Sequence, residues 1–151
     1  MLLTVGVALA VVTFVLVLRG QHDVPAVVAD LVRTPGMLNP DVTQVTIGST
    51  ICMRGWTRTI RPPTEYTNAL KAKQMRAYGL TGALSAYQED HLISLELGGH
   101  PTDPRNLWPE PYPRAAHVDA IENELNRKVC DGSLSLAEAQ EKESALKHSQ
   151  G

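Results

Sequence analysis

Residues 88–111, QEDHLISLELGGHPTDPRNLWPEP, constrain the fold more than any other part of the chain. A charged pair, Asp90-His91, opens a run in which apolar residues alternate with other residues, and a Gly-Gly pair ends that run. A polar turn leads to a second short apolar stretch, after which closely spaced prolines exclude regular structure. The pattern predicts one strand over 91–97 and a short second strand over 106–108.

Three other segments have the features of helices. Residues 64–78 follow a Pro-Pro pair, begin with a threonine that can cap a helix and stop at a glycine. From about residue 114 to residue 129, apolar residues recur at helical spacing before an Asp-Gly stop. A last helix is expected from Ser135, because Ser135-Leu-Ala-Glu138 is a capping box.

The chain before these helices has weaker patterns. Residues 44–53, QVTIGSTICM, alternate apolar and polar side chains and predict one or two short strands broken at Gly48. Residues 21–43 contain Gly, Pro and Asp without a sustained period, which is typical of a linker. Together the segments predict an α+β fold with a small strand–strand–helix core, flanking helices and a short N-terminal β element.

The first eighteen residues, MLLTVGVALAVVTFVLVL, contain no charged side chain. A helix of this length would reach about 27 Å, slightly less than a typical hydrocarbon core. We therefore expect residues 1–20 to form an N-terminal hydrophobic helix, either a transmembrane anchor or a signal segment. No Lys or Arg precedes the run, as one would in a typical signal peptide. A folded domain over residues 44–149 is expected to follow the linker.

Charge and cysteine content bound the function further. The net charge of −2 gives no global argument for nucleic-acid binding, but residues 54–76 are basic and residues 119–143 are acidic. Cys52 and Cys130 would form a disulfide in an exported protein and two buried apolar side chains in a cytosolic one. We favour the disulfide, whose loop of about 79 residues would contribute about 4–5 kcal/mol.

The Asp90-His91 pair has the chemistry of a hydrolytic site. A neutral imidazole is the usual general base near neutral pH, and a carboxylate binds hard divalent cations. Adjacent strand residues face opposite sides, so the two side chains can flank one site only at a strand end. The opposing interpretation is a structural histidine, because His91 is in phase with the apolar residues Ile93 and Leu95.

The sequence DHLISLELGG, followed by NLWPE and a helix, is similar to the HNH-type, or ββα-metal, nuclease motif. The similarity covers about residues 88–130, and the preceding stretch from ICMRGWTRTIRPP to LKAKQM resembles uncharacterised exported proteins that carry the same core. In that family a metal ligand and the general-base histidine are neighbours in the first strand. An asparagine follows the turn, and the helix supplies a further metal ligand. The resemblance therefore implies a ββα-metal core with an endonuclease site.

Site residues follow from the resemblance position by position. It implies that His91 is the general base, that Asp90 is a metal ligand and that Asn106 orients the base or fixes the loop. His117, in the first turn of the helix, is the nearest match to the further metal ligand. Asp119 and Glu122 are alternatives to it. One divalent metal is implied, with Mg²⁺ or Mn²⁺ favoured and Zn²⁺ or Ni²⁺ also compatible.

Other residues are candidates for substrate contact. Arg54, Arg58 and Arg61 surround a tryptophan, a composition that suits phosphate neutralisation with base stacking. The same residues could equally lie along the surface of the sheet. His100 lies in the turn, where it could touch a phosphate or be a plain loop residue. Trp108 is expected in the core.

The sequence therefore predicts a metal-dependent endonuclease that hydrolyses DNA or RNA without sequence specificity. It would be exported, either periplasmic or extracellular, or anchored in the cytoplasmic membrane by residues 1–18. No small-molecule cofactor is expected. The alternative is a catalytically inactive HNH scaffold that binds a protein or nucleic acid at the cell surface.

Overall fold

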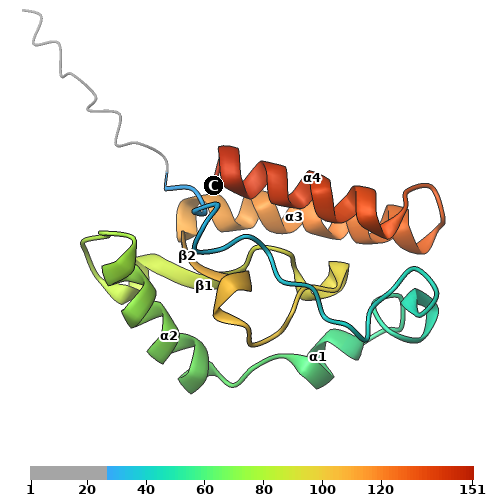
Figure 1. The fold of residues 1–151 in the computed structure, drawn as a ribbon, viewed down its shortest axis with the longest axis horizontal. Helices are drawn as coiled ribbons and strands as arrows, with labels where there is room; N and C mark the ends of the chain where they lie inside the picture. Colours follow the sequence, from blue (N-terminus) through green and yellow to red (C-terminus); the bar gives the residue numbers. More distant parts are fainter. Residues whose placement is uncertain (1–26) are drawn as a thin grey trace, which may run out of the picture.

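The computed structural model describes residues 27–151 (Figure 1). The expected anchor or signal segment at residues 1–20 and the first part of the expected linker lie outside these residues. Within residues 27–151, no helix is long and apolar enough to cross a membrane. The elements, in chain order, are α1 (Trp56–Ile60), α2 (Thr64–Ala77), β1 (Tyr87–His91), β2 (Leu107–Pro111), α3 (Tyr112–Cys130) and α4 (Leu136–Ser149).

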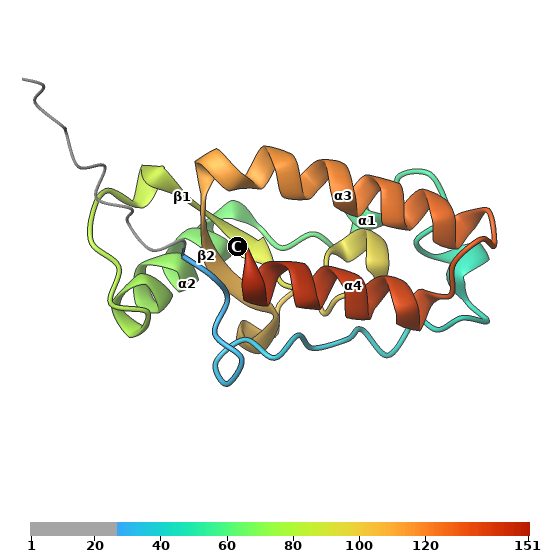
Figure 2. The same cartoon turned by 90° about the horizontal axis from the view of Figure 1, so that it is seen from above.

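These elements form a mixed α+β structure around a two-stranded antiparallel sheet. Helices α3 and α4 lie side by side and run antiparallel on one side of the hairpin, and both views show this arrangement (Figures 1 and 2). Helix α2 packs against both strands and lies below the hairpin in Figure 1. The three long helices thus confirm the helical predictions, including the capping box at Ser135.

The hairpin differs from the prediction in length and position. The second strand continues through Pro109 and Pro111, which we expected to exclude regular structure. Hydrogen bonds alternate along an antiparallel ladder, and Leu92 N donates to Asn106 O at 2.8 Å. That phase places both prolines at positions that donate no ladder hydrogen bond, so their missing N–H groups cost nothing.

The predicted strand over 91–97 is wrong, because β1 ends at His91 and residues 95–97 form a 3-10 helix. The backbone beyond His91 is held by side chains instead of by a neighbouring strand. Ile93 exchanges hydrogen bonds with the Asn106 amide, and Ser94 N donates to the Glu143 carboxylate. These side chains take the place of a ladder, so the apolar alternation is used for packing in a loop.

The predicted strands over 44–53 are also wrong, since this segment contains a 3-10 helix at Ile47–Ser49 and turns. Its hydroxyl groups compete for the backbone. Thr46 Oγ1 accepts from Thr43 N at 2.8 Å, and Thr50 Oγ1 donates to Thr46 O at 2.7 Å. Local side-chain bonds of this kind favour turns over a sheet ladder.

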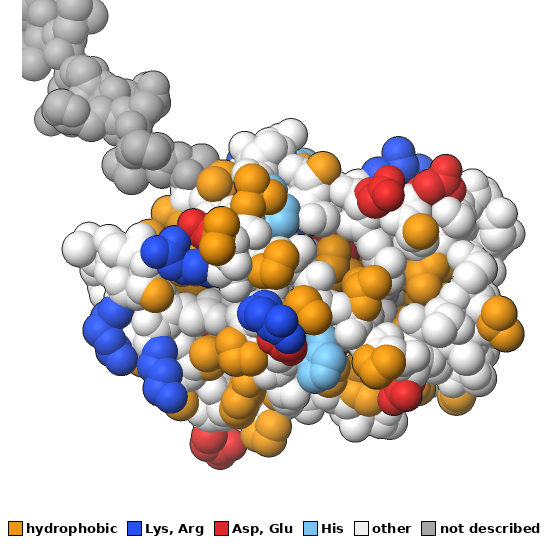
Figure 3. Space-filling view, in the orientation of Figure 1, with side chains coloured by type: hydrophobic (Ala, Val, Ile, Leu, Met, Phe, Trp, Pro, Cys, Tyr) orange, Lys and Arg blue, Asp and Glu red, His pale blue; other side chains and the backbone are white. Residues whose placement is uncertain are grey.

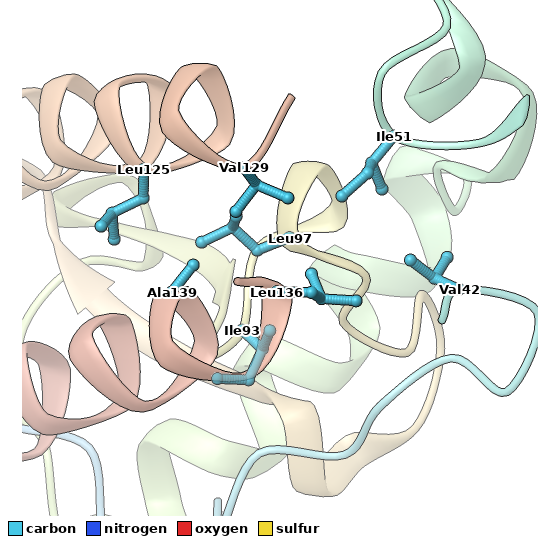
Figure 4. Packing of buried hydrophobic residues seen from close by; sticks show 8 residues of the cluster. All are labelled: Val42, Ile51, Ile93, Leu97, Leu125, Val129, Leu136 and Ala139. Carbon is cyan, nitrogen blue, oxygen red and sulfur yellow. The ribbon is translucent and has the colours of Figure 1, made fainter. Parts of the chain in front are cut away.

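A cluster of apolar side chains joins the helical layer to the loop after β1 (Figure 4). Leu125 and Val129 of α3 lie in this cluster with Leu136 and Ala139 of α4, while Ile93 and Leu97 enter from the loop between the strands. A second cluster contains Trp108, Leu92 and Ala29, and Trp108 is fully buried, as predicted. Burial of such side chains is the main stabilising term of the fold.

The segment expected to be a linker packs closely on the domain where it is described. Ala29 belongs to the second apolar cluster, and Ala29 N donates to Lys147 O at 3.0 Å. Further along, Gly36 N donates to Arg105 O at 3.1 Å. Residues 27–42 therefore form part of the structure that surrounds the hairpin.

The two glycines that follow Leu97 have different physical reasons. Gly98 ends the 3-10 helix with φ of 79°, a left-handed conformation that favours glycine. At Gly99, an added Cβ would lie 1.7 Å from Ile93 O and 2.7 Å from the side-chain nitrogen of Asn106. The pair therefore lets the loop fold tightly around Asn106.

The predicted disulfide between Cys52 and Cys130 is present. It ties the segment before α1 to the C-terminal end of α3, across a sequence separation of 78 residues. Because α1 leads to Arg61 and α3 carries the acidic helix residues, the bridge links two parts of the candidate site described below.

We predict that replacing both cysteines, Cys52→Ala with Cys130→Ala, lowers the free energy of unfolding by about 4 kcal/mol, because the unfolded chain loses a long closed loop. Urea denaturation of the oxidised wild type and the double variant measures this difference. The wild type treated with a reducing agent should match the variant. A difference below about 1 kcal/mol would contradict a stabilising role.

Candidate active site

A cavity of about 400 Å³ opens where β1 ends against α3. Asp90 and His91 both line it, although they are adjacent in the strand. They can do so because the regular strand stops at His91, which is the condition that the sequence analysis required. The wall opposite is formed by α3, and Arg61, just beyond α1, closes one side.

His91 has a buried ring with one nitrogen bonded to the backbone. The side chain is only 6% exposed, and its Nε2 lies 3.0 Å from Pro101 O. A carbonyl oxygen only accepts, so the neutral ring carries its proton on Nε2 and keeps the Nδ1 lone pair free. Burial lowers the pKa of His91 below its usual value, which favours this neutral form.

Asn106 holds the loop that orients His91. Its side chain is fully buried, and its amide group accepts from Ile93 N and donates to Ile93 O and His100 O, each at 3.0 Å. His100 is followed by Pro101, whose carbonyl accepts a hydrogen bond from His91 Nε2. Asn106 does not line the cavity, so it acts on the base through the loop.

Lys147, from the last turn of α4, lies fully buried behind the cavity. Its Nζ donates to Asp90 Oδ2 at 2.7 Å, to Glu122 Oε1 at 2.6 Å and to the carbonyl of His91. Glu143 Oε1 is 3.3 Å away. The acids that surround it hold the pKa of Lys147 well above the usual value despite its burial, so the side chain is an ammonium ion.

The cavity wall is rich in carboxylates, contributed by Glu89, Asp90, Glu96, Asp119 and Glu122. Burial raises the pKa of Glu89 to about 8 and that of Glu96 to about 7. The pKa of Asp119 is also raised, first by desolvation and then by the charge of Asp90. Carboxylates in this environment are stabilised by a nearby cation.

The side chains of the cavity suit a hydrated Mg²⁺ or Mn²⁺ ion and do not suit Zn²⁺. No group of three His, Cys, Asp or Glu side chains able to hold a metal ion occurs among residues 27–151. Mg²⁺ and Mn²⁺ need only one or two protein carboxylates and keep several waters, whereas Zn²⁺ prefers three or four protein ligands. Both carboxylate oxygens of Glu89 are buried and have no hydrogen-bond partner among the described residues, which also suits a site for a hydrated cation.

His117 was the expected further ligand. That residue is exposed at the start of α3 and does not line the cavity, whereas Asp119 and Glu122 do. Asp90 and Glu122 each bind Lys147 through one oxygen, and Asp119 is the helix carboxylate of the cavity that does not.

The candidate substrate residues lie in different places. Arg61 lines the cavity, and Arg54 lines a neighbouring cavity of about 550 Å³ beside the disulfide. Arg58 is exposed on α1 and lines neither. His100 is a turn residue, since its Nδ1 accepts from Thr102 N at 3.2 Å and from Asp103 N at 3.0 Å.

The sequence analysis missed Lys147 and Glu143. A signal was present, because both continue the buried stripe of α4 that starts at Leu136 and Ala139. A Glu and a Lys four residues apart on a helix are normally an exposed pair, so the spacing alone favoured the surface. Lys147 is buried against oxygens of β1 and α3, and Glu143 is buried against Ser94 N and the Lys147 ammonium.

No family model matches this sequence, and neither a curated protein nor a solved structure matches the chain. The function is therefore inferred from the arrangement of the side chains.

We predict that Asn106→Ala lowers the free energy of unfolding by about 3 kcal/mol, because it leaves one backbone N–H and two carbonyls without partners in a buried loop. Thermal or urea denaturation measures the loss. Asn68→Ala, at an exposed position on α2, is the matched control and should change stability by less than about 0.5 kcal/mol. Equal effects of the two substitutions would contradict the assigned role of Asn106.

We also predict that His91 titrates at a lower pH in the folded chain than in the urea-unfolded chain. The unfolded state then binds more protons, so this residue makes the fold less stable as the pH falls below about 6.5. NMR titration of the His91 ring with EDTA present tests the shift. A folded pKa equal to or above the unfolded one would refute the neutral, desolvated imidazole.

Proposed function

We propose that this protein is a metal-dependent endonuclease of the HNH type that hydrolyses phosphodiester bonds in nucleic acid. The observation that carries the proposal is that Asp90, His91 and Asp119 all line one cavity, with no hydrogen bond to the Nδ1 atom of the buried His91 ring among residues 27–151. A structural histidine would have both ring nitrogens satisfied, or one of them sealed in hydrocarbon.

In the proposed reaction, His91 Nδ1 accepts a proton from a water molecule as the water oxygen attacks phosphorus. The bond from phosphorus to the leaving oxygen breaks, and that oxygen takes a proton from solvent. Asn106 and the Pro101 carbonyl keep the ring oriented throughout. Arg61, at the rim, would bind a phosphate oxygen of the substrate.

Asp90 and Asp119 would hold Mg²⁺ or Mn²⁺. When bound, the metal would neutralise phosphate oxygens and stabilise the charge on the leaving oxygen. The acidic wall makes this cation a condition for binding as well, since the ionised carboxylates in it would otherwise repel a phosphodiester. Substrate affinity should therefore depend on the metal.

Nucleic acid is the proposed partner because Arg61 lines the cavity and further basic side chains are exposed on α2 and around α1. Lys and Arg gather on the α2 side of the face shown in Figure 3, and α2 carries the exposed Lys73 and Arg76. Arg54 and Arg58 lie near α1. Backbone charge recognised in this way carries no sequence information, so we propose cleavage without sequence preference.

We further propose that the protein acts outside the cytoplasm, either exported or held at the membrane by residues 1–18. The disulfide supports this location, because such bonds persist in oxidising compartments.

Plasmid cleavage by the full chain with Mg²⁺ or Mn²⁺ tests the function. We expect the wild type to nick and linearise the plasmid, EDTA to abolish cutting, and His91→Ala to reduce the rate at least about 100-fold with an unchanged circular dichroism spectrum. His117→Ala is the matched control and should cut at the wild-type rate, because His117 lies outside the cavity.

Loss of cutting in His117→Ala comparable to that in His91→Ala would contradict the assignment of the ligand to Asp119. A folded wild type that leaves both DNA and RNA intact with every divalent metal would refute the endonuclease. The inactive binding scaffold would then be the better interpretation.

A further inference from the structure

The C-terminal helix supplies the one buried cation in the described residues that touches the candidate site. Lys147 reaches from α4 to the end of β1 and to α3, and it binds two of the carboxylates that line the cavity, Asp90 and Glu122. The resemblance to the HNH motif covers residues 88–130 only, so α4 and this lysine lie outside it. A role for Lys147 must come from its contacts.

Those contacts sort the carboxylates of the cavity into two groups. Among the described residues, Asp90 has its Oδ2 bonded to Lys147, and no hydrogen bond involves its Oδ1. Glu122 gives its Oε1 to the same ammonium. Asp119 makes no ion pair within residues 27–151. Lys147 therefore binds one oxygen of Asp90 and one oxygen of Glu122, and it makes no ion pair with Asp119.

We propose that Lys147 is the positioning residue of the metal site, and that its charge limits how tightly the site holds a divalent cation. This inference rests on the proposed function. Lys147 fixes Asp90 by one oxygen so that the other can serve the metal, and it occupies the Oε1 atom of Glu122. The result is a site with few protein ligands, which leaves coordination positions for water and substrate.

The positive charge of Lys147 is expected to weaken the binding of a divalent cation. A buried ammonium close to the cavity repels a divalent cation, and salt screens this repulsion weakly because the group is away from solvent. Removing the charge should tighten metal binding, since it also frees Asp90 Oδ2 and Glu122 as ligands. We expect this gain in metal affinity to exceed the cost in rotamer entropy of ordering the released Asp90 side chain again when the metal binds.

A purely structural role makes the opposite prediction. If Lys147 served only to hold α4 against the hairpin, its loss would disturb the cavity and weaken metal binding together with activity. Metal affinity measured without nucleic acid therefore separates the two roles, and it does not depend on turnover.

The experiment compares the full-length wild type with Lys147→Gln by Mn²⁺ titration, with free Mn²⁺ followed by electron paramagnetic resonance. We expect Lys147→Gln to bind Mn²⁺ at least about tenfold more tightly and to cut plasmid at least about tenfold more slowly, because Asp90 is no longer held. Lys142→Gln removes an exposed charge from the same helix and should leave both values unchanged.

Lys147→Gln leaves Asp90, Glu122 and Glu143 without their counter-ion, which can prevent folding. The second variant, Glu143→Gln with Lys147→Gln, removes one of these acids as well, and a smaller tightening of Mn²⁺ binding is expected, because loss of the acid offsets part of the electrostatic gain. Near-ultraviolet circular dichroism establishes that each variant is folded before titration.

Weaker or unchanged Mn²⁺ binding in the folded variants would overturn the inference. The failure of the proposed function looks different: a wild type that binds Mn²⁺ and never cuts would refute the nuclease and still leave the shift in affinity measurable. If neither the wild type nor the variants bind Mn²⁺ at millimolar concentration, the inference is refuted.

Discussion

The buried ammonium of Lys147 is the interaction on which the arrangement of the site depends. One nitrogen joins the end of β1, the middle of α3 and the last turn of α4 through Asp90, Glu122 and the His91 carbonyl. Buried ions are costly unless they are fully paired, and removing one partner of such a group typically costs about 3–5 kcal/mol. The three elements are therefore held in one geometry, and the cavity between them keeps its shape.

Hydrogen bonds to the loop after β1 explain how the end of this strand presents both Asp90 and His91 to the cavity. The turn after His91 is stabilised by the Asn106 side chain and by the Glu143 carboxylate, so the chain leaves the sheet where Asp90 and His91 meet the cavity. Asn106 also fixes the loop whose Pro101 carbonyl accepts a hydrogen bond from the imidazole. Catalytic groups that are held by packing and hydrogen bonds before the substrate arrives need little reorganisation during the reaction.

Local signals in the sequence were sufficient for the helices, for the disulfide and for the meeting of Asp90 with His91. They failed where tertiary contacts decide. The alternation after His91 was interpreted as a strand because nothing local shows that Asn106 and Glu143 replace the ladder. The prolines of β2 were interpreted as breakers because their phase in the hairpin is set by the partner strand. Lys147 was missed because its oxygen partners lie far away in sequence.

The central claim is that Asp90 and His91 share one cavity with a hydrated divalent cation held together with Asp119. The most direct measurement is a crystal structure of the full chain grown with Mn²⁺, with anomalous scattering recorded at the manganese edge. The account predicts a peak in this cavity bonded to Asp90 and Asp119, with His91 Nδ1 facing a water molecule. A peak that is absent from the cavity, or a His91 ring with both nitrogens bonded to protein, would contradict it.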